Sequence, residues 1–121
     1  MFASAKGVDN LISTIDYNGR QIDCDTKDVL SLGDLKTKLE AFDWVVLEEK
    51  SVNDLEKVIA ILEKAKSETG KGKPVAILLH TEMGNGVDFM MGTHAWHGKA
   101  PNDEQLERAL EQNPETELKD Y

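Results

Sequence analysis

The feature that most constrains the fold is a short, continuously apolar segment, PVAILLH, at residues 74–80. An apolar run of this length is typical of a strand that is buried on both faces, and such strands occur in parallel sheets with helices on each side. A strand of this kind needs neighbouring strands and two covering layers. The segment therefore predicts an α/β fold.

Two further strands and three helices are predicted around this segment. Apolar and β-branched residues predict strands at 11–16 and 44–49. Apolar residues at helical spacing predict helices at three places. The first is predicted at residues 29–42, with the strongest pattern from Asp34 onward. The second begins at the capping sequence Ser51–Asp54 and ends at Gly70. The third is predicted at residues 103–112, after Asn102.

The helical spacing also predicts which side chains face the core. The expected inward residues are Leu55, Val58, Ile59, Leu62 and Ala65 in the second helix, and Leu106, Ala109 and Leu110 in the third. Met1 to Lys6 resembles the last turns of a helix ended by Gly7. A helix tail without a beginning is compatible with a chain that starts inside a larger structural unit, and equally with a frayed or adventitious N-terminus.

The alternation of strands and helices predicts a parallel sheet of about three strands, flanked by helices through right-handed crossovers. Ligands of such sheets bind at the carboxyl ends of the strands. Residues 16–19 follow the first strand and include the Asn18–Gly19 turn pair, while residues 80–98 follow the third. Both loops are therefore expected on one rim of the sheet, as one site.

Charge and cysteine content exclude several classes of partner. The chain has 23 acidic and 14 basic residues, a formal charge of −9, so repulsion argues against nucleic acid or an anionic membrane surface as a partner. The single cysteine, Cys24, leaves no internal disulfide and suits a reducing cytosol. The sequence shows neither a membrane-spanning apolar run nor a signal peptide. A cytoplasmic protein is expected.

Two histidines, His94 and His97, lie three positions apart in GTHAWHGKAPNDEQ at residues 92–105. Taken alone, they are compatible with metal ligation, acid catalysis, phosphate binding or an ordinary surface loop. With His80 and Cys24 they would supply four zinc ligands of the right type. The glycines around the pair, and the absence of a helix that fixes the histidine spacing, make zinc the least favoured interpretation.

Four longer segments carry a resemblance to a known family: DNLISTIDYNGRQIDC (9–24), AFDWVVLEE (41–49), KPVAILLHTEMGNGVDFM (73–90) and THAWHGKAPNDEQLERAL (93–110). Together they resemble a transketolase, and more narrowly the amino-terminal subunit of two-chain transketolases. The DYNGxQID and HxxHGxxPxD elements, in this order and at this separation, are more specific than a single glycine-rich motif. The resemblance runs over about residues 1–112.

The resemblance implies the thiamine diphosphate-binding fold, with Mg²⁺ between the protein and the cofactor's diphosphate. In the family, an asparagine and a backbone carbonyl two residues later ligate the ion, and these positions match Asn18 and Arg20. Magnesium prefers such hard oxygen ligands. His97 matches a histidine that lies by the diphosphate and the substrate, and is the expected catalytic residue. His94 and Gly19 are the other expected cofactor-binding residues.

The chain also departs from the family pattern. Only 17 residues precede Asn18, so the family's earlier Gly-Asp-Gly motif, with its acidic magnesium ligand, is absent. The second domain, which carries the glutamate that activates the cofactor, is absent too. Cys24 stands where relatives usually have glycine. We therefore expect residues 1–113 to be a partial diphosphate-binding domain of a truncated chain, and residues 114–121 to be a disordered tail.

Two functions are compatible with these observations. The first is a truncated transketolase-like subunit, inactive alone; by resemblance, the complete enzyme transfers a two-carbon ketol unit between sugar phosphates, and a partner subunit or a homo-oligomer would complete the site. The alternative is a non-catalytic interaction protein that keeps the fold without the cofactor. Its contacts would be an open sheet edge and the apolar loop residues Met83, Phe89, Met90 and Met91.

Overall fold

A three-stranded parallel sheet forms the centre of the molecule. The computed structural model describes residues 1–50 and 52–114. The strands are β1 (Ile12–Asp16), β2 (Val45–Glu49) and β3 (Val75–Leu79), in the order β1-β3-β2. The predicted α/β class, the parallel sheet and the positions of the three strands are confirmed.

The apolar segment that led to the prediction is the central strand. Val75 of β3 pairs with Ile12 of β1 on one side and with Val45 of β2 on the other. Residues 75–78 are at most 2% exposed. A strand with neighbours on both edges and layers on both faces has no side chain in water, which explains why every residue of it is apolar.

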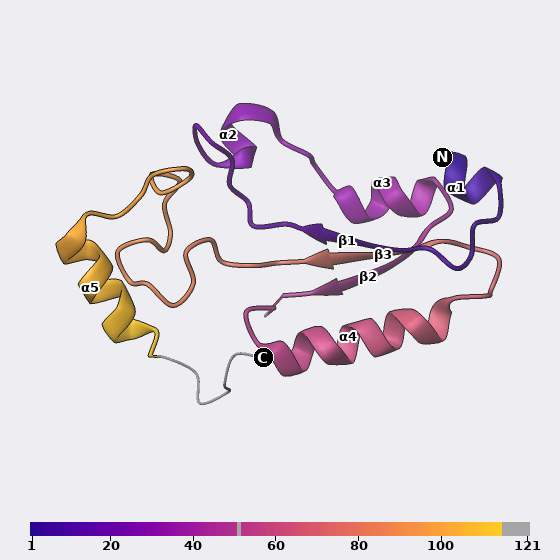
Figure 1. Cartoon of the computed structure of the whole chain (residues 1–121). Coiled ribbons are helices and arrows are strands. Elements are labelled where there is room, and N and C mark those ends of the chain that lie inside the picture. Colours follow the sequence, from indigo (N-terminus) through magenta and orange to yellow (C-terminus); the bar gives the residue numbers. More distant parts are fainter. Residues whose placement is uncertain (51, 115–121) are drawn as a thin grey trace.

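Helices α3 (Leu35–Ala41) and α4 (Leu55–Glu68) connect the strands and lie on opposite faces of the sheet (Figure 1). The chain steps from β1 over β3 to β2 and then back to β3, so its direction across the sheet reverses. Because crossovers between parallel strands are right-handed, a reversal of direction puts the two helices on opposite faces. Helix α3 packs on β2, while α4 packs on β2 and β3.

The core beneath α4 differs from the predicted one by a rotation of the helix. Ile61 and Ala65 are buried against Val75 and Ile77, whereas Leu55 and Ile59 are 71% and 52% exposed. The prediction that Leu55 and Ile59 face the core is wrong. The predicted and observed stripes are both helically spaced and share positions 58, 62 and 65, so periodicity alone could not choose between them.

The predicted helix at 29–42 is two helices. Helix α2 (Thr26–Leu30) ends at Ser31, whose backbone is extended and whose hydroxyl accepts from the Gly33 amide at 3.2 Å. Serine bonds of this kind compete with helix continuation. Helix α3 then begins after Asp34, as predicted; Asp34 Oδ1 accepts from the Thr37 amide at 2.9 Å. This bond and one from the Thr37 hydroxyl lower the pKa of Asp34.

The outer helices lie at opposite ends of the sheet (Figure 1). Helix α1 (Phe2–Ala5) precedes Gly7, as predicted, and α5 (Asp103–Gln112) has the predicted bounds and a capping box at Asn102. Leu106 and Leu110 of α5 are 46% and 60% exposed, so the prediction that they face inward is wrong. The reason is that α5 lies beyond the carboxyl ends of the strands rather than on the sheet.

Some predictions fall on residues that the structure does not describe. The predicted cap Ser51 and positions 115–121 of the tail lie outside the described residues. The cap that is observed for α4 is Asp54, whose side chain accepts from the Glu56 amide at 3.0 Å. None of the helices within residues 1–50 and 52–114 has the length and apolar character that a membrane crossing requires.

Candidate functional site

The loops after β1 and β3 start side by side at the carboxyl edge of the sheet. The Tyr17 amide donates to the Leu79 carbonyl at 2.7 Å, and the Thr81 hydroxyl bonds the Asp16 carboxylate. In Figure 1 both loops extend from this edge toward α2 and α5. The prediction that residues 16–19 and the start of residues 80–98 share one rim is confirmed.

The first loop is closed on itself around Asn18. The side-chain oxygen of Asn18 accepts from the Arg20 amide at 2.9 Å, the turn that asparagine favours. The Thr26 amide donates to the Gly19 carbonyl at 2.9 Å, and Arg20 bridges to Asp25 in antiparallel fashion. These bonds fix the backbone that follows Asn18, and the bond from the Tyr17 amide to the Leu79 carbonyl fixes the backbone before it.

A pocket of about 310 Å³ opens at this loop. Its lining residues are Tyr17, Asn18, Gly19, Arg20, Asp25, Thr26, Lys27, Ser31 and Leu32. A neighbouring pocket of about 260 Å³ shares the wall from Tyr17 to Arg20 and adds Leu30. The predicted residues Asn18, Gly19 and Arg20 therefore line a cavity together.

The oxygens of this pocket fit magnesium in type but not in number. The Asn18 amide oxygen accepts one hydrogen bond and keeps a second lone pair, and the Arg20 carbonyl is a further neutral oxygen. The carboxylate of Asp25 is paired with Arg20, and with Lys27 at 3.6 Å. Among the described residues, no three His, Cys, Asp or Glu side chains gather as metal ligands. Mg²⁺ commonly takes one or two protein carboxylates, so these residues supply part of a site.

The second loop carries His94 and His97. The His97 amide donates to the His94 carbonyl at 3.0 Å, and the Ala95 amide donates to the Thr93 hydroxyl at 3.1 Å, so the segment is a turn. His97 is exposed and His94 is half-buried. Neither imidazole hydrogen-bonds to another residue of the described part of the chain.

Trp96 anchors this turn to the segment before it. Its indole N–H donates to the Phe89 carbonyl at 2.9 Å, and the two rings lie edge to face at 5.2 Å. Lys99 covers the Trp96 ring at 4.8 Å. The apolar stretch that we expected to be exposed is therefore partly packed within its own loop; of its four residues, Met91 remains an exposed large hydrophobic, at 42%.

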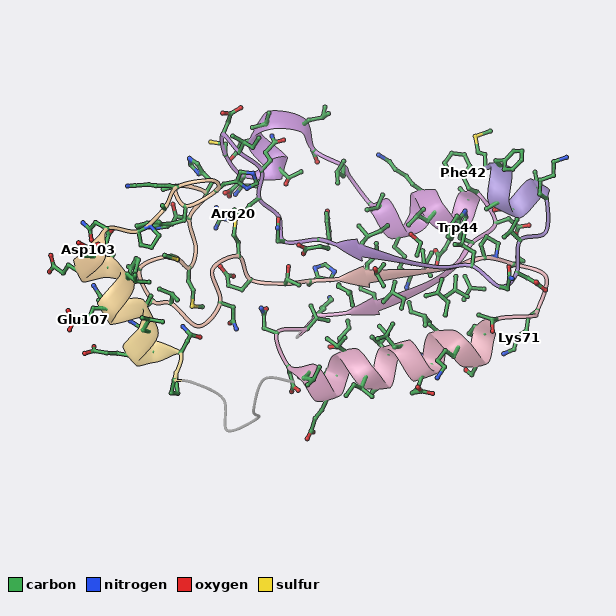
Figure 2. All side chains as sticks on the ribbon, in the orientation of Figure 1. Arg20, Phe42, Trp44, Lys71, Asp103 and Glu107 are labelled. Carbon is green, nitrogen blue, oxygen red and sulfur yellow. The ribbon has the colours of Figure 1, made fainter. Side chains whose placement is uncertain are left out.

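Arg20 joins the two loops. Its guanidinium pairs with Asp25 through one nitrogen and donates through the other to the Gly92 carbonyl at 3.0 Å, a contact between residues 72 positions apart. Figure 2 shows Arg20 where the loop after β1 meets the loop that precedes α5. The Asn18 pocket and the start of the histidine turn are thus directly connected.

A second polar group lies on the same rim, and the sequence did not indicate the contacts that His80 makes in it. His80 Nε2 lies 2.7 Å from Glu48 Oε1, and the Tyr17 ring packs edge to face on His80 at 5.2 Å. Glu82, also missed as a site residue, accepts from the Gly92 amide at 2.9 Å. The only indication in the sequence was the position of two of these residues: Tyr17 directly follows β1, and His80 directly follows β3.

Comparisons with known proteins agree with this architecture. Residues 1–117 match the family described as transketolase, thiamine diphosphate binding domain. An apulose-4-phosphate transketolase subunit of Actinobacillus succinogenes is 38% identical over 113 residues, which are 93% of this chain and 38% of that protein. The 6-deoxy-6-sulfo-D-fructose transketolase subunit SqwG of Clostridium sp. is 34% identical over 110 residues, 91% of this chain and 39% of that protein.

Solved structures show the same relationship. Transketolase from Campylobacter jejuni superposes with a TM-score of 0.78 at 29% identity, over 92% of this chain and 17% of that chain. The chain thus spans less than two fifths of the curated relatives that it matches. Nearly its whole length is nevertheless covered by the family, by these relatives and by the superposed structure. The chain belongs to the transketolase thiamine diphosphate-binding domain family.

Proposed function

We propose that this chain, through residues 1–113, forms part of a transketolase subunit of the separate amino-terminal kind and acts when another chain completes the site. The observation that carries the proposal is the connection of the Asn18 pocket to the His97 turn through Arg20. A loop with oxygen ligands beside a loop with free imidazoles is what a magnesium diphosphate needs. The cytoplasm remains the predicted compartment.

Each residue has a distinct part in this proposal. The Asn18 side-chain oxygen and the Arg20 carbonyl would ligate Mg²⁺, and Gly19 keeps the turn between them. The exposed His97 would donate a hydrogen bond to a diphosphate or substrate phosphate oxygen, and His94 would line the same approach. Thiamine diphosphate, when bound, supplies the carbanion chemistry that carries a two-carbon ketol unit between sugar phosphates.

The chain alone is expected to be inactive, because the Asn18 pocket offers Mg²⁺ two neutral oxygens and an Asp25 carboxylate that is already paired with Arg20. Without an unpaired carboxylate at the Asn18 pocket, only the cofactor's diphosphate would balance the charge of the ion there, which weakens the hold of the protein on it. The relatives from Actinobacillus succinogenes and Clostridium sp. are each named as a subunit of a transketolase, which supports a partner chain here as well. Completion by a second chain is therefore part of the proposal.

A chimera tests the proposal with the rest of the subunit present. Residues 1–113 of this chain replace the matched segment of the Actinobacillus succinogenes protein, which is purified together with its own partner chain. We expect ketol transfer that requires magnesium and thiamine diphosphate. His97→Ala should lower kcat/KM by about tenfold or more, the effect of one lost charge-assisted bond. The exposed Lys57→Ala should change nothing. A folded, assembled chimera that binds no cofactor would contradict the proposal.

The alternative function, a non-catalytic interaction protein, is favoured by one observation. Leu106 and Leu110 lie one turn apart on α5 and are both exposed, and within residues 1–50 and 52–114 no further strand pairs with the outer edges of β1 and β2. Such surfaces usually find a partner. The same chimera separates the two functions, because an interaction protein would assemble without binding thiamine diphosphate or magnesium.

A further inference from the structure

We propose that the Arg20 side chain, together with Glu82, is a positioning device that sets where the histidine turn lies relative to the Asn18 pocket. The proposed ligand at position 20 is the backbone carbonyl, so magnesium binding does not by itself require an arginine there. The role of these two side chains in catalysis rests on the proposed function. Their role in holding the histidine turn in place is independent of that function.

The Arg20 and Glu82 side chains bind the two backbone polar groups of one residue, the carbonyl and the amide of Gly92. The Gly92 carbonyl accepts from Arg20 Nη2 at 3.0 Å, and its amide donates to Glu82 Oε1 at 2.9 Å. The first partner belongs to the loop after β1 and the second to the loop after β3. Gly92, itself in the loop after β3, is therefore fixed to the loop after β1 and to the start of its own loop, two residues before His94 and five before His97.

Each arm of the device is itself held in place. Asp25 pairs with the other nitrogen of the Arg20 guanidinium, which orients the planar fork toward Gly92. On the opposite side, the Glu82 amide donates to the Asn53 side-chain oxygen at 2.8 Å, which ties Glu82 to the connection before α4. The bonds run as one chain from Asp25 through Arg20, Gly92 and Glu82 to Asn53.

The rest of the segment shows why such a device is needed. Asp88 bonds Arg108 and Gln112 of α5, and Trp96 packs on Phe89, so residues 86–112 form a unit held mainly by contacts within itself. Figure 1 shows α5 beyond the carboxyl ends of the strands, away from the helices that cover the sheet. A unit that does not pack on the sheet depends on anchors such as Gly92 for its position.

The single cysteine offers a direct measurement. Cys24 lies in the loop that contains Arg20 and Asp25, and a nitroxide label on it reports its distance to the histidine turn through paramagnetic broadening of amide signals. The experiment uses the purified full chain, without cofactor. It compares wild type with Arg20→Met, which removes the fork but keeps the backbone carbonyl, with Glu82→Ala, and with the conservative Glu82→Gln.

We expect the label to broaden the amide signals of residues 92–98 in wild type and in Glu82→Gln, whose amide oxygen still accepts from Gly92. In Arg20→Met and Glu82→Ala the broadening should fall, and the Gly92 and His97 amides should exchange about tenfold faster. Amides of β3 should stay unchanged, which shows that the fold persists. Because Glu82 is exposed, its substitution reports even if Arg20→Met unfolds.

Equal broadening and equal exchange in wild type and Glu82→Ala, or in wild type and a folded Arg20→Met, would overturn the inference. Loss of both features in Glu82→Gln would overturn it as well, because that variant keeps the acceptor. No cofactor enters the measurement, so a chimera without thiamine diphosphate binding would contradict the proposed function and leave this result intact.

Discussion

His80 Nε2 and Glu48 Oε1 lie 2.7 Å apart, and this contact joins the carboxyl ends of β3 and β2 on the face of the sheet opposite α4. Leu47 and Leu79 pack toward α4, so the alternation of side chains along a strand turns Glu48 and His80 to the other face. Tyr17 from the end of β1 packs on the same imidazole. Glu48 of β2 and the residues that directly follow β1 and β3, Tyr17 and His80, thus form a row beside the site.

The His80–Glu48 pair should couple measurably in a double-mutant cycle. We expect Glu48→Ala and His80→Ala to show a coupling free energy of about 0.5–1 kcal/mol in urea unfolding, the upper range for partly exposed pairs. The matched control is Glu63 and Lys66 on the exposed side of α4, where the coupling should be about 0.3 kcal/mol. Equal coupling free energies in the two pairs would mean that the His80–Glu48 contact stabilises the fold no more than an ion pair on the exposed side of α4.

Two isoleucines on α4 test which face of the helix meets the sheet. Ile61 is 7% exposed and Ile59 is 52% exposed. We expect Ile61→Ala to lower the free energy of unfolding by about 2–4 kcal/mol, through lost burial and a cavity, and Ile59→Ala to lower it by about 1 kcal/mol or less. Urea titrations followed by circular dichroism measure both, and a larger loss for Ile59→Ala would show that the helix is rotated as the sequence pattern first indicated.

Gly84 should tolerate a side chain less well than Gly98, although both have a positive φ, of 75° and 79°. A Cβ at Gly84 would lie 2.7 Å from the Met90 carbonyl oxygen, whereas a Cβ at Gly98 would meet nothing within 4 Å. We expect Gly98→Ala to cost about 1 kcal/mol, the backbone penalty alone, and Gly84→Ala to cost more. Thermal unfolding followed by tryptophan fluorescence compares them, and equal shifts in Tm would contradict the expected clash.

The contact between α5 and its loop should weaken in acid. Hydrogen bonds from Gln112 and Arg108 hold the pKa of Asp88 below its ordinary value. A carboxyl whose pKa is lowered by folding stabilises the folded state fully above the unfolded value, about 3.9, and loses that contribution as the pH falls through the folded value.

A pH titration checks this sign. Between pH 7 and 4.5 the side-chain N–H signals of Arg108 and Gln112 in a nuclear magnetic resonance spectrum should stay constant, and below about pH 4 they should shift as their partner Asp88 is protonated. In Asp88→Asn the low-pH shift should be absent. A transition of the same signals near neutral pH in the wild type would contradict the assignment to Asp88.

The sheet could be predicted from the sequence because burial on both faces leaves a local signature. Residues 75–79 are apolar at every position, and Asn102 has the side chain and spacing of a helix cap. The rotation of α4 and the exposure of Leu106 could not be predicted, because amphipathic spacing shows that a helix has an apolar face without showing what lies against it.

Neighbouring residues of the candidate site could be grouped from the sequence, whereas the contacts between its loops could not. Asn18, Gly19 and Arg20 line one pocket, and their roles toward magnesium and the cofactor stay predictions. Arg20 and Gly92 are 72 positions apart in the sequence, and no local sequence pattern indicates a hydrogen bond between residues so far apart. The pairing of Glu48 with His80 was missed for the same reason.

We propose that this chain holds only part of a thiamine diphosphate site. The most direct measurement is a calorimetric titration of thiamine diphosphate, with magnesium present, into the purified chain, with the oligomeric state recorded at the same concentration. We predict no detectable binding at micromolar concentration, because Asn18 and the Arg20 carbonyl are both neutral. Micromolar, magnesium-dependent binding by the monomer, abolished by Asn18→Ala, would contradict the claim and show that these residues suffice.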